Sequence, residues 1–81
     1  IIKEKNVRVR IEGHTDIQGT ASFNQTLSIK RAESIKKFLV QKGIEAKYLE
    51  IAGYGSSKPV ASNATPAGRS LNRRVEFIII E

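Results

Sequence analysis

The sequence predicts an α+β fold, a two-layer βαβ-β core in which helices pack on one face of a small mixed sheet. Two observations favour this class: an alternating β-type segment is followed by one long helical segment, and two further β-rich segments come later in the chain. A chain of 81 residues has room for one domain with a modest core. We therefore expect a single domain over residues 1–81.

The first predicted strand covers residues 7–12 (VRVRIE), in which apolar and polar residues alternate strictly. This period is typical of a strand with one buried face, here the face of Val7, Val9 and Ile11. The next segment, residues 13–19 (GHTDIQG), has a glycine at each end and polar residues between them. It predicts a loop at the carboxyl end of the strand.

Residues 23–42 form the predicted helix. Ser22 is a suitable N-cap, Gln25 stands at the third helical position of a capping box, and Gly43 marks the C-terminal end. Residues 48–52 (YLEIA) predict a short strand that completes a βαβ unit with the first strand and the helix.

The C-terminal half contains a loop segment and a strong strand signal. Residues 53–72 include both prolines and many small polar residues, which predicts a long, exposed loop. Residues 75–80 (VEFIII) are almost continuously apolar and rich in β-branched side chains. This pattern is typical of an interior strand, so we expect it at the centre of the sheet.

Composition limits the possible functions without choosing one. The formal net charge of +6 favours an anionic partner, and nucleic acid, acidic lipid and anionic glycan are all admissible. The absence of cysteine excludes disulfides and thiolate metal sites. No apolar run approaches the roughly 18 residues that a membrane-spanning helix needs.

Two polar residues, Asn24 and Arg31, fall on the apolar side of the predicted helix. On a wheel of about 100° per residue, that side also carries Leu27, Ala32, Ile35, Phe38 and Leu39. A guanidinium that faces a core needs a partner because it stays charged. Asp16, in the loop before the helix, is the nearest candidate.

The pair of Asp16 and Arg31 has two interpretations. It is a structural ion pair that closes the end of the sheet, or it is a receptor for a zwitterion. A fixed carboxylate suits an ammonium group, and a guanidinium fork suits a carboxylate. Clefts at the carboxyl ends of strands are also common ligand sites in open αβ sheets.

Five spaced motifs resemble those of the OmpA C-terminal-like family, which also occurs in peptidoglycan-associated lipoproteins and flagellar stator proteins. They are GHTD at 13–16, Asn24, LS at 27–28 with RA at 31–32, GYG at 53–55, and GR at 68–69 with NRRVE at 72–76. The motifs stand in the family's order from about residue 7 to the end of the chain.

The resemblance implies a non-catalytic domain that binds peptidoglycan non-covalently and tethers the outer membrane or a membrane complex to the cell wall. It implies that Asp16 binds the ammonium and Arg31 the carboxylate of diaminopimelate, or of another diamino acid, in the stem peptide. Asn24 and Arg73 fall where the family places supporting contacts. No cofactor or metal is implied, and the implied location is periplasmic and associated with the outer membrane.

The chain departs from the family pattern at its start. Family members usually have a further strand and helix before the segment that matches Val7, and we expect residues 1–6 to be the tail of that helix. The strand contributes part of the pocket wall in the family. It therefore stays open whether a second copy of the chain completes the sheet and forms a homodimer.

Other functions receive less support. One histidine and no cysteine disfavour a closed zinc site at His14 and Asp16, and we expect His14 to fix the loop through a side-chain-to-backbone hydrogen bond. Residues 53–58 (GYGSSK) lack phosphate-loop spacing and indicate a turn. No serine has the partners of a catalytic triad.

Two other classes of function stay open as alternatives. The first is a nucleic-acid interface of Arg69, Arg73, Arg74 and the helix lysines, although an aromatic content of 6% offers little for stacking on bases. The second is a purely structural or oligomerising module.

Overall fold

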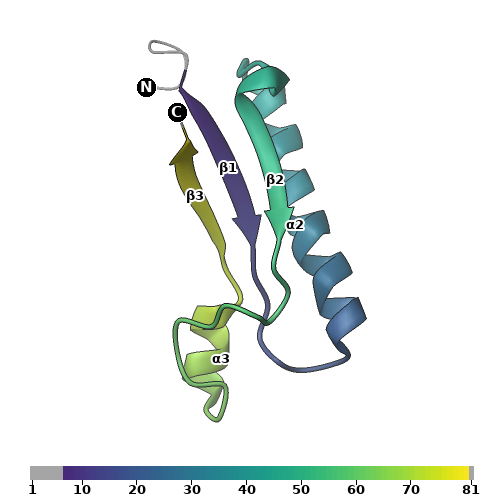
Figure 1. Ribbon diagram of the computed structural model, residues 1–81, viewed down its shortest axis with the longest axis vertical. Coiled ribbons are helices and arrows are strands. Elements are labelled where there is room, and N and C mark those ends of the chain that lie inside the picture. Colours follow the sequence, from purple (N-terminus) through teal and green to yellow (C-terminus); the bar gives the residue numbers. More distant parts are fainter. Residues whose placement is uncertain (1–6, 81) are drawn as a thin grey trace.

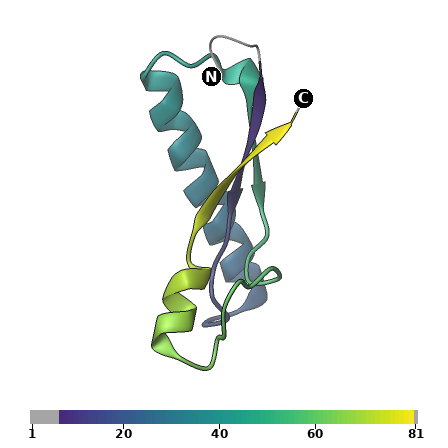
Figure 2. The same ribbon diagram turned by 90° about the vertical axis from the view of Figure 1, so that its left-hand side faces the viewer.

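The computed structural model describes residues 7–80, which form a three-stranded sheet with one long helix on one of its faces (Figures 1 and 2). The elements are β1 (Arg8–Gly13), α2 (Ala21–Gln41), the 3-10 helix η1 (Ala46–Tyr48), β2 (Leu49–Gly53), α3 (Pro66–Asn72) and β3 (Val75–Ile80). The predicted α+β class is confirmed. The expectation for residues 1–6 lies outside the described residues.

The sheet has the order β2-β1-β3, so β1 is the central strand. β1 pairs in parallel with β2, as the predicted βαβ unit requires, and antiparallel with β3. The prediction that residues 75–80 lie at the centre is wrong, because β3 is at the edge. The apolar sequence of β3 does not mean that both of its faces are buried, since Phe77 and Ile79 are 55% and 59% exposed.

The helix α2 packs closely on β1 and β2 at their carboxyl ends. A Cβ atom on Gly13 would lie 2.0 Å from the carbonyl oxygen of Ser28, and one on Gly53 would lie 2.4 Å from a side-chain carbon of Ile29. Glycine is therefore required at the end of both strands for this approach. The small buried residues Ser28 and Ala32 provide the matching surface on the helix.

The core lies between α2 and the two parallel strands. Its buried apolar residues are Val9, Ile11, Ala32 and Leu49, with Ile35, Leu39, Ile44, Ile51 and Val75 packed around them. Phe38, predicted on the same helical arc, is 53% exposed because α2 covers β1 and β2 but not β3. No helix among residues 7–80 is long and apolar enough to span a membrane.

The start of α2 differs from the sequence prediction. Thr20 is the N-cap, and its hydroxyl accepts a hydrogen bond from the backbone N–H of Phe23 at 3.1 Å. Ser22 is already inside the helix. Gln25 forms no capping box and instead donates its side-chain amide to the carbonyl of Gly53 at 2.6 Å, which ties the first turns of α2 to the end of β2.

The predicted loop over residues 53–72 contains a helix, α3. Thr65 caps it by accepting the N–H of Gly68 at 3.0 Å, and Pro66 occupies the first turn. A capping threonine followed by proline is a helix-start signal, and the small polar residues around it had masked this signal. The turn predicted in residues 53–58 is confirmed.

Asn72, at the end of α3, organises the loop before it and is fully buried. Its side-chain oxygen accepts the N–H groups of Val60 and Ala61 at 2.8 and 3.0 Å. Its amide nitrogen donates to the carbonyl of Ala61 and to the side chain of Asn63. The segment is therefore an ordered structure beyond the carboxyl ends of β1 and β2, as Figure 1 shows.

The two candidate caps of α2 can be separated by mutation. We expect Thr20→Ala to lower the free energy of unfolding by about 1 kcal/mol, because the N–H of Phe23 loses its acceptor. Ser22→Ala is the matched control and should change it by less than about 0.5 kcal/mol. Urea denaturation measures both, and equal losses in the two variants would contradict the assignment.

Candidate ligand site at the carboxyl ends of the parallel strands

The loop from β1 to α2 is fastened by backbone hydrogen bonds on both sides. The N–H of His14 donates to the carbonyl of Arg74 at 2.9 Å, and the N–H of Thr15 donates to the carbonyl of Gly55 at 2.8 Å. The segments that follow β2 and precede β3 thus hold the loop between them. Because His14, Thr15 and Asp16 are buried, their side chains have fixed positions.

The carboxylate of Asp16 is almost enclosed, with 7% of its side chain exposed. One oxygen forms an ion pair with Nη1 of Arg73 at 2.7 Å, and the other accepts the N–H of Gln18 at 3.0 Å. The bond from Arg73 is the main cause that holds the pKa of Asp16 below its ordinary value of 3.8, followed by the bond from Gln18. Asp16 is therefore ionised at neutral pH.

Arg31 does not pair with Asp16 in the structure. Its Nη1 donates to the carbonyl oxygen of His14 at 3.2 Å, and Arg31 is half-buried. The prediction of a direct Asp16–Arg31 ion pair is wrong because Arg73, just after α3, is in contact with the carboxylate. The two residues still belong to one cluster, since Arg31 binds the loop two residues before Asp16.

Asn24 has the inward position predicted for it and is 3% exposed. Its amide nitrogen donates to the backbone carbonyl of Asp16 at 3.2 Å. Asn24 therefore fixes the backbone that carries the carboxylate, while Arg73 contacts the carboxylate itself. All four predicted site residues, Asp16, Asn24, Arg31 and Arg73, hold this loop or contact it.

An apolar groove of about 370 Å³ opens beside Arg31. It is lined by Leu27, Lys30, Arg31, Ser34, Ile35 and Val75. The groove runs between α2 and the start of β3, where the sheet extends beyond the cover of the helix. The guanidinium of Arg31 thus stands between a polar loop and an apolar surface.

His14 behaves differently from the prediction. It is 1% exposed, and neither ring nitrogen has a hydrogen-bond partner among the described residues. The expected side-chain-to-backbone bond is therefore absent, and the loop is held by the backbone of His14 instead. Burial, and then the charge of Arg74, lower the pKa of His14 below 6.5, which favours a neutral imidazole at pH 7.

No pattern in the sequence points to several residues that complete this end of the molecule. The carbonyls of Gly55 and Arg74 hold the loop, and Gln25 joins α2 to β2. These contacts join positions far apart in the chain through backbone atoms, which no residue type specifies. The motifs around them are identifiable in the sequence only as features of the family.

Comparison with known proteins now identifies the family. The OmpA family profile matches residues 1–73. This chain belongs to the OmpA family. Among its solved structural relatives is the peptidoglycan-associated lipoprotein from Burkholderia pseudomallei, with a TM-score of 0.92 and 31% identity, over 96% of this chain and 66% of that one. The C-terminal domain of MotB from Helicobacter pylori gives a TM-score of 0.88 and 31% identity, over 95% of this chain and 60% of that one.

Curated relatives of this OmpA-family domain are also similar in sequence. The outer-membrane lipoprotein YfiB of Pseudomonas aeruginosa is 51% identical over 72 residues, which are 89% of this chain and 43% of that protein. The peptidoglycan-binding protein ArfA of Mycobacterium tuberculosis is 43% identical over 74 residues, 91% of this chain and 23% of that protein. The chain thus spans less than half of these relatives. The outer membrane porin F of Pseudomonas aeruginosa is 51% identical over 67 residues, 82% of this chain and 19% of that protein. The predicted periplasmic, outer-membrane-associated location is confirmed by the lipoprotein relatives and this porin.

The depressed pKa of Asp16 has a measurable consequence for stability. The contribution of its ion pair with Arg73 is complete above the unfolded-state pKa and is lost as pH falls through the lower folded-state pKa. We expect the free energy of unfolding of the wild type to fall between about pH 4 and pH 2 more steeply than that of Asp16→Asn. Urea titrations at several pH values measure this.

Glu76 also has a lowered pKa through Arg74, but it is present in both proteins and cancels in the comparison. Parallel pH profiles for the wild type and Asp16→Asn would show that the Asp16–Arg73 ion pair contributes no net stability.

Proposed function

We propose that this OmpA-family domain is a non-catalytic module that binds peptidoglycan and tethers the membrane protein that carries it to the cell wall. The observation that carries the proposal is the match along 91% of the chain to a relative named as a peptidoglycan-binding protein. The fold relative named as a peptidoglycan-associated lipoprotein supports it. The fixed, charged loop at the end of β1 supplies a carboxylate that can bind the ligand.

The proposed ligand group is the zwitterionic side-chain end of diaminopimelate, or of an equivalent diamino acid, in the stem peptide. Asp16 would accept hydrogen bonds from its ammonium group. The carboxylate is ionised, and its two oxygens offer about four acceptor positions, of which Gln18 and Arg73 occupy one each. Arg73 is 42% exposed in its side chain, so it can shift to admit the ammonium group.

Arg31 is the proposed partner of the ligand carboxylate. A guanidinium has five N–H donors, and the structure uses one of them on the carbonyl of His14. The donors that stay available suit a bidentate bond to a carboxylate. The apolar groove beside Arg31, with Leu27 and Val75 in its lining, suits the methylene chain of the diamino acid.

Asn24 and Arg73 are proposed as supporting residues. Asn24 holds the backbone of Asp16, and Arg73 holds its carboxylate and keeps it ionised. Their substitution should therefore weaken binding by misplacing Asp16, and by less than substitution of Asp16 or Arg31.

Co-sedimentation with purified sacculi tests the proposal. Hydrogen bonds that involve charged groups contribute about 1.5–3 kcal/mol each. We therefore expect Asp16→Ala and Arg31→Ala each to weaken binding by roughly 10- to 100-fold. Circular dichroism checks that each variant is folded, and Lys37→Ala, on the exposed face of α2, is the matched control that should bind as the wild type does.

The same assay separates this function from a nucleic-acid interface. Wall binding through a buried carboxylate should change little between 50 and 200 mM salt, whereas binding to phosphates through Arg69, Arg73 and Arg74 would weaken steeply. If folded wild-type protein stays in the supernatant, or if folded Asp16→Ala and Arg31→Ala sediment as the wild type does, the proposal is wrong.

We also propose that a second copy of this chain pairs along β3. Within residues 7–80, β3 is an edge strand with open backbone groups. The exposed side chains of Phe77 and Ile79 are the cross-strand partners of Ile11 and Val9, so they lie on the same sheet face as α2, beyond the part that the helix covers. Antiparallel pairing of two β3 strands would satisfy the backbone groups and bury these side chains around a two-fold axis.

Sedimentation velocity tests the dimer. The wild type should show a concentration-dependent dimer, and Phe77→Lys should reduce the dimer at least tenfold, since it places a charge in the apolar contact. Val60→Lys, at a similarly exposed apolar position in the loop before α3, is the control. A wild type that is monomeric at all concentrations would contradict the dimer and leave the wall-binding proposal unaffected.

A further inference from the structure

Two glutamates face each other on the sheet surface that α2 does not cover. Glu12 of β1 is the direct cross-strand partner of Glu76 of β3. Like charges in this position destabilise a sheet unless they are compensated. Nε of Arg10 bonds Oε2 of Glu12 at 2.8 Å, and Nε of Arg74 bonds Oε2 of Glu76. Each arginine thus binds Oε2 of its glutamate and forms no hydrogen bond with Oε1.

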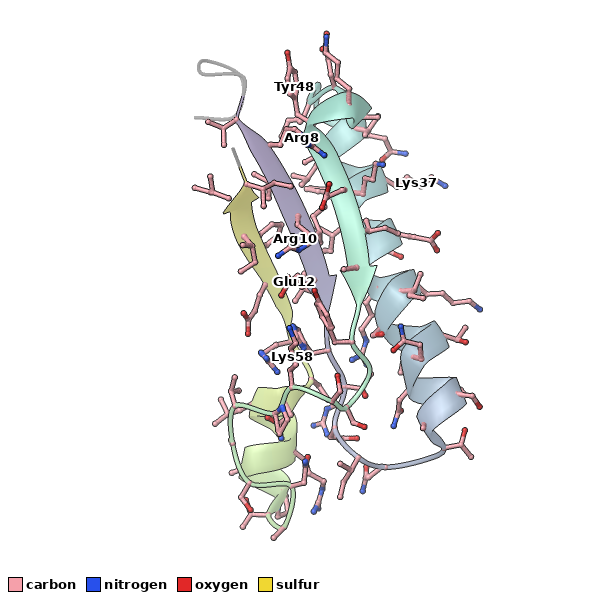
Figure 3. The ribbon with its side chains drawn as sticks, in the orientation of Figure 1. Arg8, Arg10, Glu12, Lys37, Tyr48 and Lys58 are labelled. Atoms are coloured by element: carbon pink, nitrogen blue, oxygen red, sulfur yellow. The ribbon has the colours of Figure 1, made fainter. Side chains whose placement is uncertain are left out.

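The imidazole of His14 completes this cluster two residues beyond Glu12. Its Nε2 lies 3.8 Å from Oε1 of Glu12, too far for a hydrogen bond. The ring of Tyr54 stacks on His14 at 5.5 Å between centroids, and the hydroxyl of Tyr54 donates to Oε2 of Glu12 at 3.3 Å. Figure 3 shows Arg10 and Glu12 in succession along β1, with Lys58 beyond the end of the strand.

The buried imidazole of His14 lacks the hydrogen-bond partners that buried polar groups normally have. His14 is 1% exposed and both of its nitrogens are without partners. A buried donor or acceptor without a partner destabilises the folded state, and such an atom is usually explained by a bound water or ion. One ligand atom from each of Glu12, His14 and Glu76 lies within 4.8 Å of the other two.

We propose that Glu12, His14 and Glu76 form a binding site for a divalent, zinc-type cation. One imidazole nitrogen and two carboxylate oxygens form a donor set that Zn²⁺ accepts, with a fourth position for water. Bonds of about 2.0–2.2 Å to the metal require the three atoms to approach by roughly 1 Å. Glu76, whose side chain is 38% exposed, has the freedom to make this movement.

The surrounding charges make the site selective for a strongly bound ion. Arg10 and Arg74 balance the two glutamates, and Lys58 lies over the Tyr54 ring at 4.0 Å. A cation held by charge alone, such as Na⁺ or Mg²⁺, therefore gains little here. Zn²⁺ gains a bond to imidazole, which the positive neighbours do not compete for.

Zinc titration of the tag-free protein tests the site. We expect one equivalent of Zn²⁺ to bind by calorimetry at pH 7.5, and saturating Zn²⁺ to raise Tm by roughly 5 °C or more. Because the chain has one histidine, the NMR signals of its imidazole report on this site alone, and they should shift with Zn²⁺ and not with Mg²⁺.

Variants locate the ion. Glu76→Gln and His14→Phe, the latter keeping an aromatic ring beside Tyr54, should each weaken Zn²⁺ binding at least tenfold. Glu50→Gln is the matched control, since Glu50 lies on the same face and pairs with Arg8 and Arg10 but is not part of the cluster. It should bind Zn²⁺ as the wild type does.

The proposal is overturned if the wild-type imidazole signals do not move with Zn²⁺, or if Glu76→Gln binds Zn²⁺ as tightly as the wild type. The first outcome would leave a bound water as the partner of His14. Should His14→Phe fail to fold, the wild-type NMR signals and Glu76→Gln still decide. None of these measurements depends on binding to peptidoglycan.

Discussion

The close contact between α2 and the glycine ends of β1 and β2 determines the geometry of this domain. No side chain fits between the Cα of Gly13 and the backbone of Ser28, or between Gly53 and Ile29. The helix therefore lies against the sheet at the point where the parallel strands end. Its first turns are brought to the loop after β1, so Asn24 and Arg31 reach backbone carbonyls of that loop.

The charges at this end are arranged around one carboxylate. Asp16 is nearly enclosed, and a buried carboxylate is stable only with donors around it. Those donors come from its own loop, through Gln18, and from the residue after α3, Arg73. The short helix α3 and its buried Asn72 therefore contribute to the site, because they place Arg73. Arg31 keeps donors that no group among residues 7–80 uses.

The five residues from Glu12 to Asp16 serve two sides of the molecule. Glu12 and His14 alternate with Gly13 and lie toward the surface that α2 leaves open, where Glu76 and Tyr54 meet them. Asp16 lies at the start of the loop and is held by Arg73. The same short segment thus carries the carboxylate that we propose binds the ligand, and a buried imidazole. The backbone bonds of His14 and Thr15 keep both in place.

The sequence by itself determined the three strands, the long helix and the family, but not the short helix α3. Alternation identified β1, amphipathic spacing identified α2 and placed Asn24 and Arg31 on its inner side, and spaced motifs identified the OmpA family, because each of these signals is carried by side chains close in the chain. Tertiary structure alone decided the rest. The edge position of β3, the pairing of Asp16 with Arg73 in place of Arg31, and the meeting of His14 with Glu76 depend on strand order and register. These are set by packing between distant segments, and the position of a residue in the chain does not encode which distant charge it will meet.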